Sequence, residues 1–269
     1  MNGQPVHFDA VARSAPLTGA EREHFLEIIE SAVEVRRTAQ LFLWAQGPLQ
    51  RLLPHEILVF GAASGNGASV SLQKLSSTRY FTDAHFADVC RPGQGLVVRV
   101  MSSWHRYGTP LLVSRALRSW EAQDDWLAAA EAQELKNLAA HGMRTPAGRV
   151  GTFFCFARVG CEFDLRLSYR LALLMPCLHE VLTRVCLEER RISARLLRGE
   201  ASVTERETEI LRWIRDGKTN DHIARILNVS RYTVKNHIQK ILRKMAAENR
   251  SHAVARAISL GILGVAERE

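Results

Sequence analysis

The feature that most constrains the fold is a stretch near the C-terminus, 202–257, in which short apolar runs alternate with polar turns. Apolar residues spaced three and four apart occupy one face of a helix, so each run predicts a short amphipathic helix. The apolar positions, in chain order, are Ile210, Leu211 and Ile214; Ile223, Ala224 and Leu227; and Val234, Ile238, Ile241, Leu242 and Met245.

The ends of these helices are also marked in the sequence. Thr204 followed by Glu207 has the capping-box spacing of a helix start, and Gly217 stands where a glycine ends a helix. Ser230 opens the third helix. Three helices joined by tight polar turns form the helix-turn-helix pattern, in which the last helix enters the major groove of DNA.

The charge of the third helix agrees with that role. Between Ser230 and Met245 there are five basic residues and no acidic one, which suits a phosphate backbone. A solvated basic face on an ordinary helix is the alternative, and the charge alone leaves both open. The spacing of all three helices favours DNA binding. The basic residues are Arg231, Lys235, Lys240, Arg243 and Lys244.

The same stretch resembles the DNA-binding domain of the LuxR-type regulators, a family with a four-helix DNA-binding unit. Two positions depart from the family pattern: His222 replaces a usual glutamate, and 245–247 replaces a Leu-x-Val. The matching motifs are Thr204-Glu205-Arg206-Glu207, Gly217-Lys218-Thr219-Asn220, Ile223-Ala224, Ser230, Thr233-Val234-Lys235, His237, Lys244, Arg250 and Ala253-Val254.

This resemblance and the helix geometry give the candidate DNA contacts. Lys235, Asn236 and Gln239 lie opposite the apolar face, and the matching positions of the family reach base edges. Lys suits guanine, and Asn and Gln suit adenine. The predicted phosphate contacts flank them or lie at the start of the second helix, where free N–H groups favour an anion. They are Lys218, Thr219, Asn220, Ser230, Arg231, Thr233, His237, Lys240 and Arg243.

A fourth helix after Asn249 is expected to contribute to a homodimer. Its first half must cover the core of the small domain, but Ile258 and Ile262 lie further out, where the sequence offers no partner. An apolar stripe left uncovered indicates self-association. The stripe comprises Val254, Ala257, Ile258, Gly261 and Ile262.

The rest of the chain is long enough for one more domain. We divide the 269 residues into an N-terminal arm (1–20), an α/β domain (21–192), a linker (193–201) and the helical domain (202–269). The net charge of +8 favours an acidic partner. The five cysteines contain no Cys-x-x-Cys pair, so neither a disulfide framework, a zinc site nor any other metal or cofactor is indicated. Without a signal segment or membrane span, a cytoplasmic location is expected.

The α/β domain is predicted to hold a small antiparallel sheet with flanking helices, as in GAF or autoinducer-binding sensor domains. A glycine-rich turn, 61–67, connects the first two strands as a hairpin rather than as a phosphate loop, because no Gly-Lys-Ser/Thr and helix follow it. The expected strands are 57–60, 70–75, 111–113 and 150–159. The first expected helix opens at Thr18 or Glu21 and is ended by Gly47-Pro48, and the others are 82–90, 94–107, 126–140 and 163–192.

The last of these helices has two interpretations. Its apolar residues alternate at intervals of four and three, which is coiled-coil spacing, although Pro176 interrupts the pattern. Either the helix packs on its own sheet, or it forms the seam of a dimer. The spaced residues are Leu167, Leu171, Leu174, Leu178, Val181 and Val185.

The α/β domain also resembles the EpsA regulators, which stand beside exosortase (PEP-CTERM) and exopolysaccharide gene clusters. The matching segments are 41–47, 53–59 and Leu178-His179-Glu180. The resemblance implies control of polysaccharide or biofilm genes. A small-molecule effector is a further candidate, held by some of six aromatic residues that otherwise belong to the core: Trp44, Tyr80, Trp104, Tyr107, Trp120 and Trp126.

Other function classes fit less well. The histidines show neither metal spacing nor a nucleophile motif, so no enzyme is indicated. Region 4 of a sigma factor uses a similar helix-turn-helix, but a fourth helix and the lack of a promoter-melting region argue against it. The expected partners are double-stranded DNA and a second copy of the chain, with RNA polymerase as a further candidate.

Overall fold

A computed structural model describes residues 17–63, 69–115, 123–197, 203–247 and 249–264. The chain divides into two compact units, Met1–Cys186 and Leu187–Glu269. Within the described ranges, no helix carries an 18-residue stretch apolar enough to cross a membrane.

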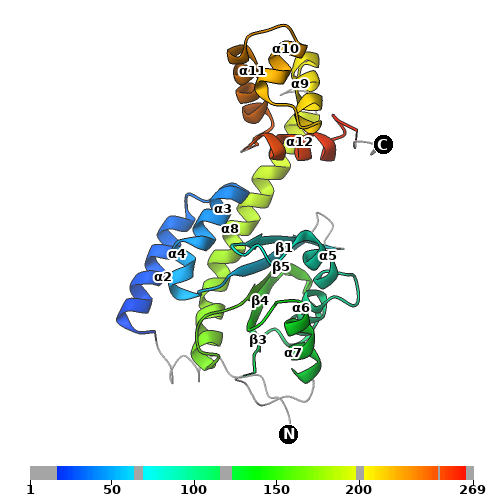
Figure 1. Ribbon diagram of the computed structural model, residues 1–269. Coiled ribbons are helices and arrows are strands. Elements are labelled where there is room, and N and C mark those ends of the chain that lie inside the picture. Colours follow the sequence, from blue (N-terminus) through cyan, green and yellow to red (C-terminus); the bar gives the residue numbers. More distant parts are fainter. Residues whose placement is uncertain (1–16, 64–68, 116–122, 198–202, 248, 265–269) are drawn as a thin grey trace. The chain divides into compact units, whose positions relative to one another are not determined.

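The described strands of the N-terminal unit form one antiparallel sheet in the order β2-β1-β5-β4-β3 (Figure 1). The predicted hairpin is confirmed, because β1 and β2 pair directly, although residues 64–68 of its turn lie outside the described ranges. β5 is central in the sheet and buried along most of its length. The strands are β1 (Ile57–Ala63), β2 (Val70–Ser76), β3 (Leu111–Val113), β4 (Leu138–Arg144) and β5 (Val150–Ala157).

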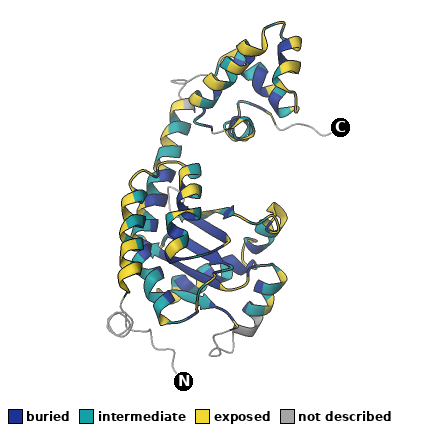
Figure 2. Cartoon of the chain, turned by 60° about the vertical axis from the view of Figure 1, so that its left-hand side comes forward, coloured by how far each residue is buried: buried dark blue, intermediate teal, exposed yellow. Residues whose placement is uncertain are grey.

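Helices cover both faces of this sheet, so alternate residues of its central strands belong to two separate cores. Phe154 and Phe156 of β5 pack with helices α2, α3, α4 and α8, whereas Phe153 and Cys155 pack with α5, α6 and α7. The buried strands lie between these helical layers (Figure 2). The helices are α2 (Gly19–Ala32), α3 (Thr38–Gln46), α4 (Pro48–Leu52), α5 (Asp83–Val89), α6 (Leu96–Tyr107), α7 (Gln123–Ala132) and α8 (Leu165–Leu197).

The single helix predicted between Thr18 or Glu21 and Gly47 is wrong, because the structure has two helices there. α2 begins at Gly19 with Thr18 as its cap, which is one of the two predicted starts, and α3 begins at Thr38. The Gln40 side chain accepts hydrogen bonds from the N–H groups of residues 36 and 37 and so caps α3. Trp44 then donates its indole N–H to the Ile28 carbonyl at 3.3 Å. The bend lets Trp44 be buried against α2, which a straight helix would prevent.

The helix predicted for 126–140 is confirmed only as far as Ala132, where α7 ends, and its second half is wrong because β4 begins at Leu138. The turn between them holds Glu134 and Asn137 at positive φ. Ala139 and Ala140 are fully buried in β4 and pack into opposite cores. Their intrinsic preference for helix is overridden by pairing with β3 and β5.

α8 is one continuous helix with Pro176 inside it, and it extends further than predicted. The segment expected as a linker, 193–201, is helical as far as Leu197, and residues 198–202 lie outside the described ranges. All the residues at coiled-coil spacing pack in the first core of the N-terminal unit. The interpretation of α8 as a helix packed on its own sheet is therefore the one that the structure supports.

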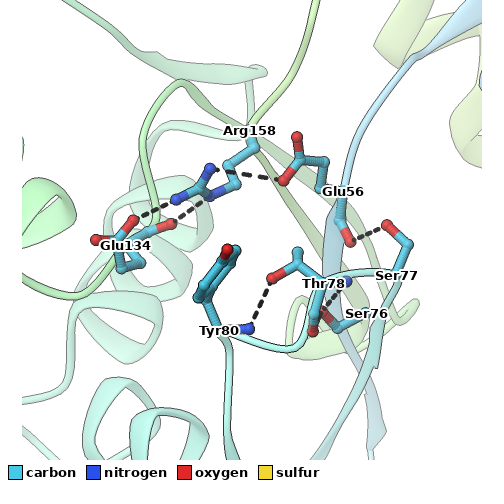
Figure 3. Close-up of polar contacts among 7 residues, drawn as sticks. All are labelled: Glu56, Ser76, Ser77, Thr78, Tyr80, Glu134 and Arg158. Atoms are coloured by element: carbon cyan, nitrogen blue, oxygen red, sulfur yellow. Dashed lines mark hydrogen bonds and ion pairs between the residues drawn. The ribbon is translucent and has the colours of Figure 1, made fainter.

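An ion-pair network ties together the chain segments at one end of the sheet (Figure 3). Arg158, which follows β5 and has φ 53°, pairs with Glu134, and its guanidinium lies 3.6 Å from the Glu56 carboxylate. The Ser77 hydroxyl donates to the Glu56 carbonyl at 3.2 Å, and the Tyr80 N–H donates to the Thr78 hydroxyl at 3.0 Å. The left-handed backbone of Arg158 is thus held by contacts to two other segments.

The six aromatic residues suggested as pocket lining do not gather in one place. Trp44 is buried on one side of the sheet, and Trp104 and Trp126 on the other. Tyr80 and Tyr107 are exposed, and Trp120 lies outside the described ranges. The second core does contain a polar pair, in which the Trp104 indole N–H donates to His141 Nδ1 at 2.8 Å. Burial lowers the pKa of His141 to about 4, so the ring is neutral near pH 7.

Candidate nucleic-acid interface

Four short helices make up the C-terminal unit beyond α8 and the segment that follows it, and each begins with a side-chain cap. Thr204, Thr219, Ser230 and Asn249 each accept a hydrogen bond from the N–H three residues ahead. These caps satisfy donors that a helix start leaves free, which fixes where each helix begins. The helices are α9 (Glu205–Arg215), α10 (Asn220–Ile226), α11 (Arg231–Lys244) and α12 (Arg250–Ser259).

The turns between the helices are equally well determined. Gly217 has φ 76° and follows α9, and the N–H of Lys218 bonds the Trp213 carbonyl at 3.0 Å in the glycine-terminated helix end that the sequence predicted. Asn228 follows α10 with φ 50° and ends that helix in the same left-handed conformation, and the next N–H, of Val229, bonds the Ala224 carbonyl at 3.0 Å. Arg250 of α12 donates to the Lys218 carbonyl at 2.5 Å, so α12 supports the first turn.

α9 and α11 are joined by a buried charge pair. The Glu207 carboxylate accepts from the Thr204 N–H at 2.9 Å and from Lys244 Nζ at 2.7 Å. Burial opposes ionisation of Glu207, but the hydrogen bonds from Lys244 and Thr204 outweigh it and lower the pKa of the carboxyl below its usual value. The capping box predicted for α9 therefore also locks α11 in place.

One face of α11 packs in the core of this unit and the opposite face is open. Val234 and Ile241 are fully buried. The predicted base-reading residues Lys235 and Gln239 are exposed, and Asn236 is half-buried. No acidic residue lies on α11 itself, so the outward side of the helix presents amides and cations. Such a face can donate to acceptors on guanine and can pair with both edge groups of adenine.

The predicted phosphate contacts fall at two places next to this face. Lys218 and Thr219 are exposed and Asn220 is half-buried at the start of α10. Along α11, Arg231, Lys240 and Arg243 are exposed, as is Ser230 at its cap, while Thr233 and His237 are half-buried.

Some of these groups are already engaged within the domain. The Thr219 and Ser230 hydroxyls serve as caps, and Arg231 lies 3.4 Å from Asp221. The Nδ1 atom of His237 is buried and has no hydrogen-bond partner among the described residues.

The stripe expected on the fourth helix is only partly available to a partner. Ala257 is fully buried, and Gly261, at φ 69°, follows the end of α12 rather than lying within it. The expectation that Ile258 and Ile262 find no partner in the domain is wrong, because both pack against its core while staying half-buried. Val254 packs there too, as predicted. Most of this stripe packs inside the small domain, because α12 covers the part of the core that the other three helices leave open.

The open face also holds a residue that the helix-turn-helix pattern does not mark. Tyr232, the second residue of α11, is 71% exposed, and it stands among polar and basic residues. The sequence signal was an aromatic residue placed opposite Val234 in the first turn of the third helix.

The fold and the open basic face of α11 define a helix-turn-helix DNA-binding domain. More narrowly, residues 201–257 match the model of the bacterial regulatory proteins of the luxR family.

The chain is also similar to longer stretches of known regulators. It is 32% identical over 131 residues to the transcriptional activator protein AhyR of Aeromonas hydrophila, covering 48% of this chain and 49% of that protein. It is 35% identical over 143 residues to the quorum sensing-dependent transcriptional regulator VjbR of Brucella ovis, covering 51% and 52%. The chain thus spans about half the length of the curated relatives it matches.

Among solved structures, the chain is similar to the N-acylhomoserine lactone-dependent LuxR-family factor CepR2 of Burkholderia cenocepacia. The two are 15% identical with a TM-score of 0.45, and the similarity covers 63% of this chain and 99% of that one.

Proposed function

We propose that the protein is a sequence-specific DNA-binding transcriptional regulator that binds a pseudo-palindromic site as a dimer. The observation that carries this proposal is the face of α11, where Lys235, Asn236 and Gln239 stand opposite the buried Val234 and Ile241. The caps, the turns and the Glu207–Lys244 pair hold that face in a fixed direction.

The dimer is proposed from symmetry and from what remains exposed. Two copies related by a two-fold axis would place their α11 helices about one DNA turn apart, which a pseudo-palindromic site matches. The half-buried Ile258 and Ile262 leave some apolar surface next to α12 for this contact. RNA polymerase is a further proposed partner.

The proposal extends to the target genes and to an effector. Control of exopolysaccharide genes rests on the resemblance of the N-terminal segments to the EpsA regulators. A small-molecule effector would bind in the N-terminal domain. Genome-wide footprinting with the purified protein yields the target genes and the half-site spacing together. Binding sites that lie away from polysaccharide genes would contradict the proposed control of exopolysaccharide genes.

The test of sequence reading uses the site that footprinting provides. Asn236→Ala and Gln239→Ala should each cost about 1–3 kcal/mol on the specific site and little on random DNA, since each removes a base contact. Lys240→Ala should weaken both kinds of binding alike. If Asn236→Ala and Gln239→Ala also weaken binding to the specific site and to random DNA equally, these residues contact the DNA backbone. The proposed base reading is then wrong.

Sedimentation of the full chain, with and without the site, tests the dimer. We expect two chains on each full site. A single chain that binds one half-site would overturn the dimer while leaving the DNA-binding proposal intact.

A further inference from the structure

Tyr232 is the large hydrophobic side chain of α11 that the domain leaves exposed. It is 71% exposed, whereas Val234 and Ile241 of the same helix are fully buried and Ile238 packs against the core. An aromatic ring at this exposure keeps most of its apolar surface in water, which is unfavourable unless a partner covers it.

The position of Tyr232 links it to the proposed base-reading residues. Tyr232, Asn236, Gln239 and Arg243 are spaced four, three and four residues apart, so they form one row along the outward face of α11. Helical side chains lean toward the N-terminus, which places the Tyr232 ring over the first turn. In helix-turn-helix proteins the N-terminal end of the recognition helix contacts base edges.

The start of α11 is held firmly enough to direct this ring. The Ser230 hydroxyl accepts from the Thr233 N–H at 3.0 Å and lies 2.8 Å from the Thr233 hydroxyl. On the other side of Tyr232 in the sequence, Arg231 pairs with Asp221 of α10 at 3.4 Å. The residues on both sides of Tyr232 are therefore fixed to the domain, and its backbone has a defined direction.

The chemistry of the major groove narrows what such a ring can recognise. Base edges there present hydrogen-bond donors and acceptors, and the apolar group among them is the C5-methyl of thymine. The carbon ring of Tyr232 makes no ordinary hydrogen bonds, unlike its hydroxyl, so the ring gains most by packing on that methyl. We infer that Tyr232 is a specificity-determining residue that packs its ring on a thymine methyl in each half-site. This inference rests on the proposed function, because it requires α11 to enter the groove.

The experiment compares thymine with uracil, which lacks only the methyl group. The specific site is first selected from random-sequence DNA by the wild-type full-length protein. Each thymine is then replaced by uracil in turn, and the affinities of wild-type, Tyr232→Phe, Tyr232→Ala and Tyr80→Ala proteins are measured. Tyr80 is a matched control, because it is 66% exposed but lies in the N-terminal domain.

At one thymine of each half-site, uracil should weaken binding by wild-type and Tyr232→Phe protein about fourfold, the effect of burying about one methyl group. Tyr232→Ala should bind thymine and uracil equally at that position, and Tyr80→Ala should behave as wild type. Circular dichroism confirms that each variant is folded.

The outcomes separate this inference from the function on which it rests. Equal thymine preference in Tyr232→Ala and wild-type protein overturns the inference alone, and loss of affinity in Tyr232→Phe on every DNA would instead indicate a phosphate contact by the hydroxyl. If the wild-type protein selects no sequence at all, both the inference and the proposed function fail.

Discussion

The buried pair between Glu207 and Lys244 allows the arrangement of α9 and α11 to be tested directly. The Glu207 side chain is 3% exposed and the Lys244 side chain 31%. Lys244→Met leaves the carboxylate buried, with the Thr204 N–H and hydroxyl as its remaining partners among the described residues. Losing one partner of a fully buried pair costs about 3–5 kcal/mol. Because water screens the part-exposed lysine, we expect about 2 kcal/mol here.

Glu207→Gln should cost less, about 1 kcal/mol, because glutamine keeps the hydrogen bond to the Thr204 N–H. The double variant, Lys244→Met with Glu207→Gln, leaves no buried charge unpaired. The double variant should therefore be no less stable than Lys244→Met alone, which corresponds to a coupling energy of about 1 kcal/mol between the two sites.

The assay is native-state hydrogen exchange of the α9 and α11 amides in the full chain, which reports local opening of this unit. A pH series adds a second readout. Since the pKa of Glu207 is lowered on folding, its contribution is present above the unfolded-state pKa and is lost as the pH falls through the folded-state pKa. Glu207→Gln should remove this acid sensitivity. Additive effects in the double variant, or unchanged acid sensitivity in Glu207→Gln, would refute the reasoning.

Three further predictions concern other parts of the molecule. The N-terminal domain should lose about 3 kcal/mol of stability as the pH falls from about 6.5, the ordinary histidine pKa, to about 4, because His141 titrates near 4 when folded. Fluorescence-monitored unfolding measures this loss, which should be much smaller in His141→Gln. Gly142→Ala would place a Cβ atom 2.3 Å from a β5 carbonyl oxygen and 2.8 Å from the Trp104 ring. It should cost about 3 kcal/mol in thermal unfolding, whereas Gly19→Ala, with open space around it, should be tolerated. Lys240→Ala should lower the slope of log K against log salt by about one in DNA titrations, and an unchanged slope would place Lys240 away from the phosphates.

The sequence by itself determined the helix-turn-helix domain because its signals are local. Caps such as Thr204 and Ser230 act within three residues, and Gly217 acts through its own backbone angle. The apolar ladders repeat within single helices, so they predicted the buried side of α11 and, by exclusion, its open side. The strands β1, β2, β3 and β5 followed from equally local apolar runs.

The tertiary structure decided the features that depend on contacts between distant segments. β4 has helix-favouring residues and becomes a strand because β3 and β5 pair with it on both sides. α2 and α3 separate because burying Trp44 against α2 outweighs continuing one helix. The leucines of α8 have the spacing of a dimer seam, but the sheet of the same chain covers them. Spacing tells which residues share a face, whereas only the folded chain shows which surface that face meets, and for Tyr232 it shows that the face stays open.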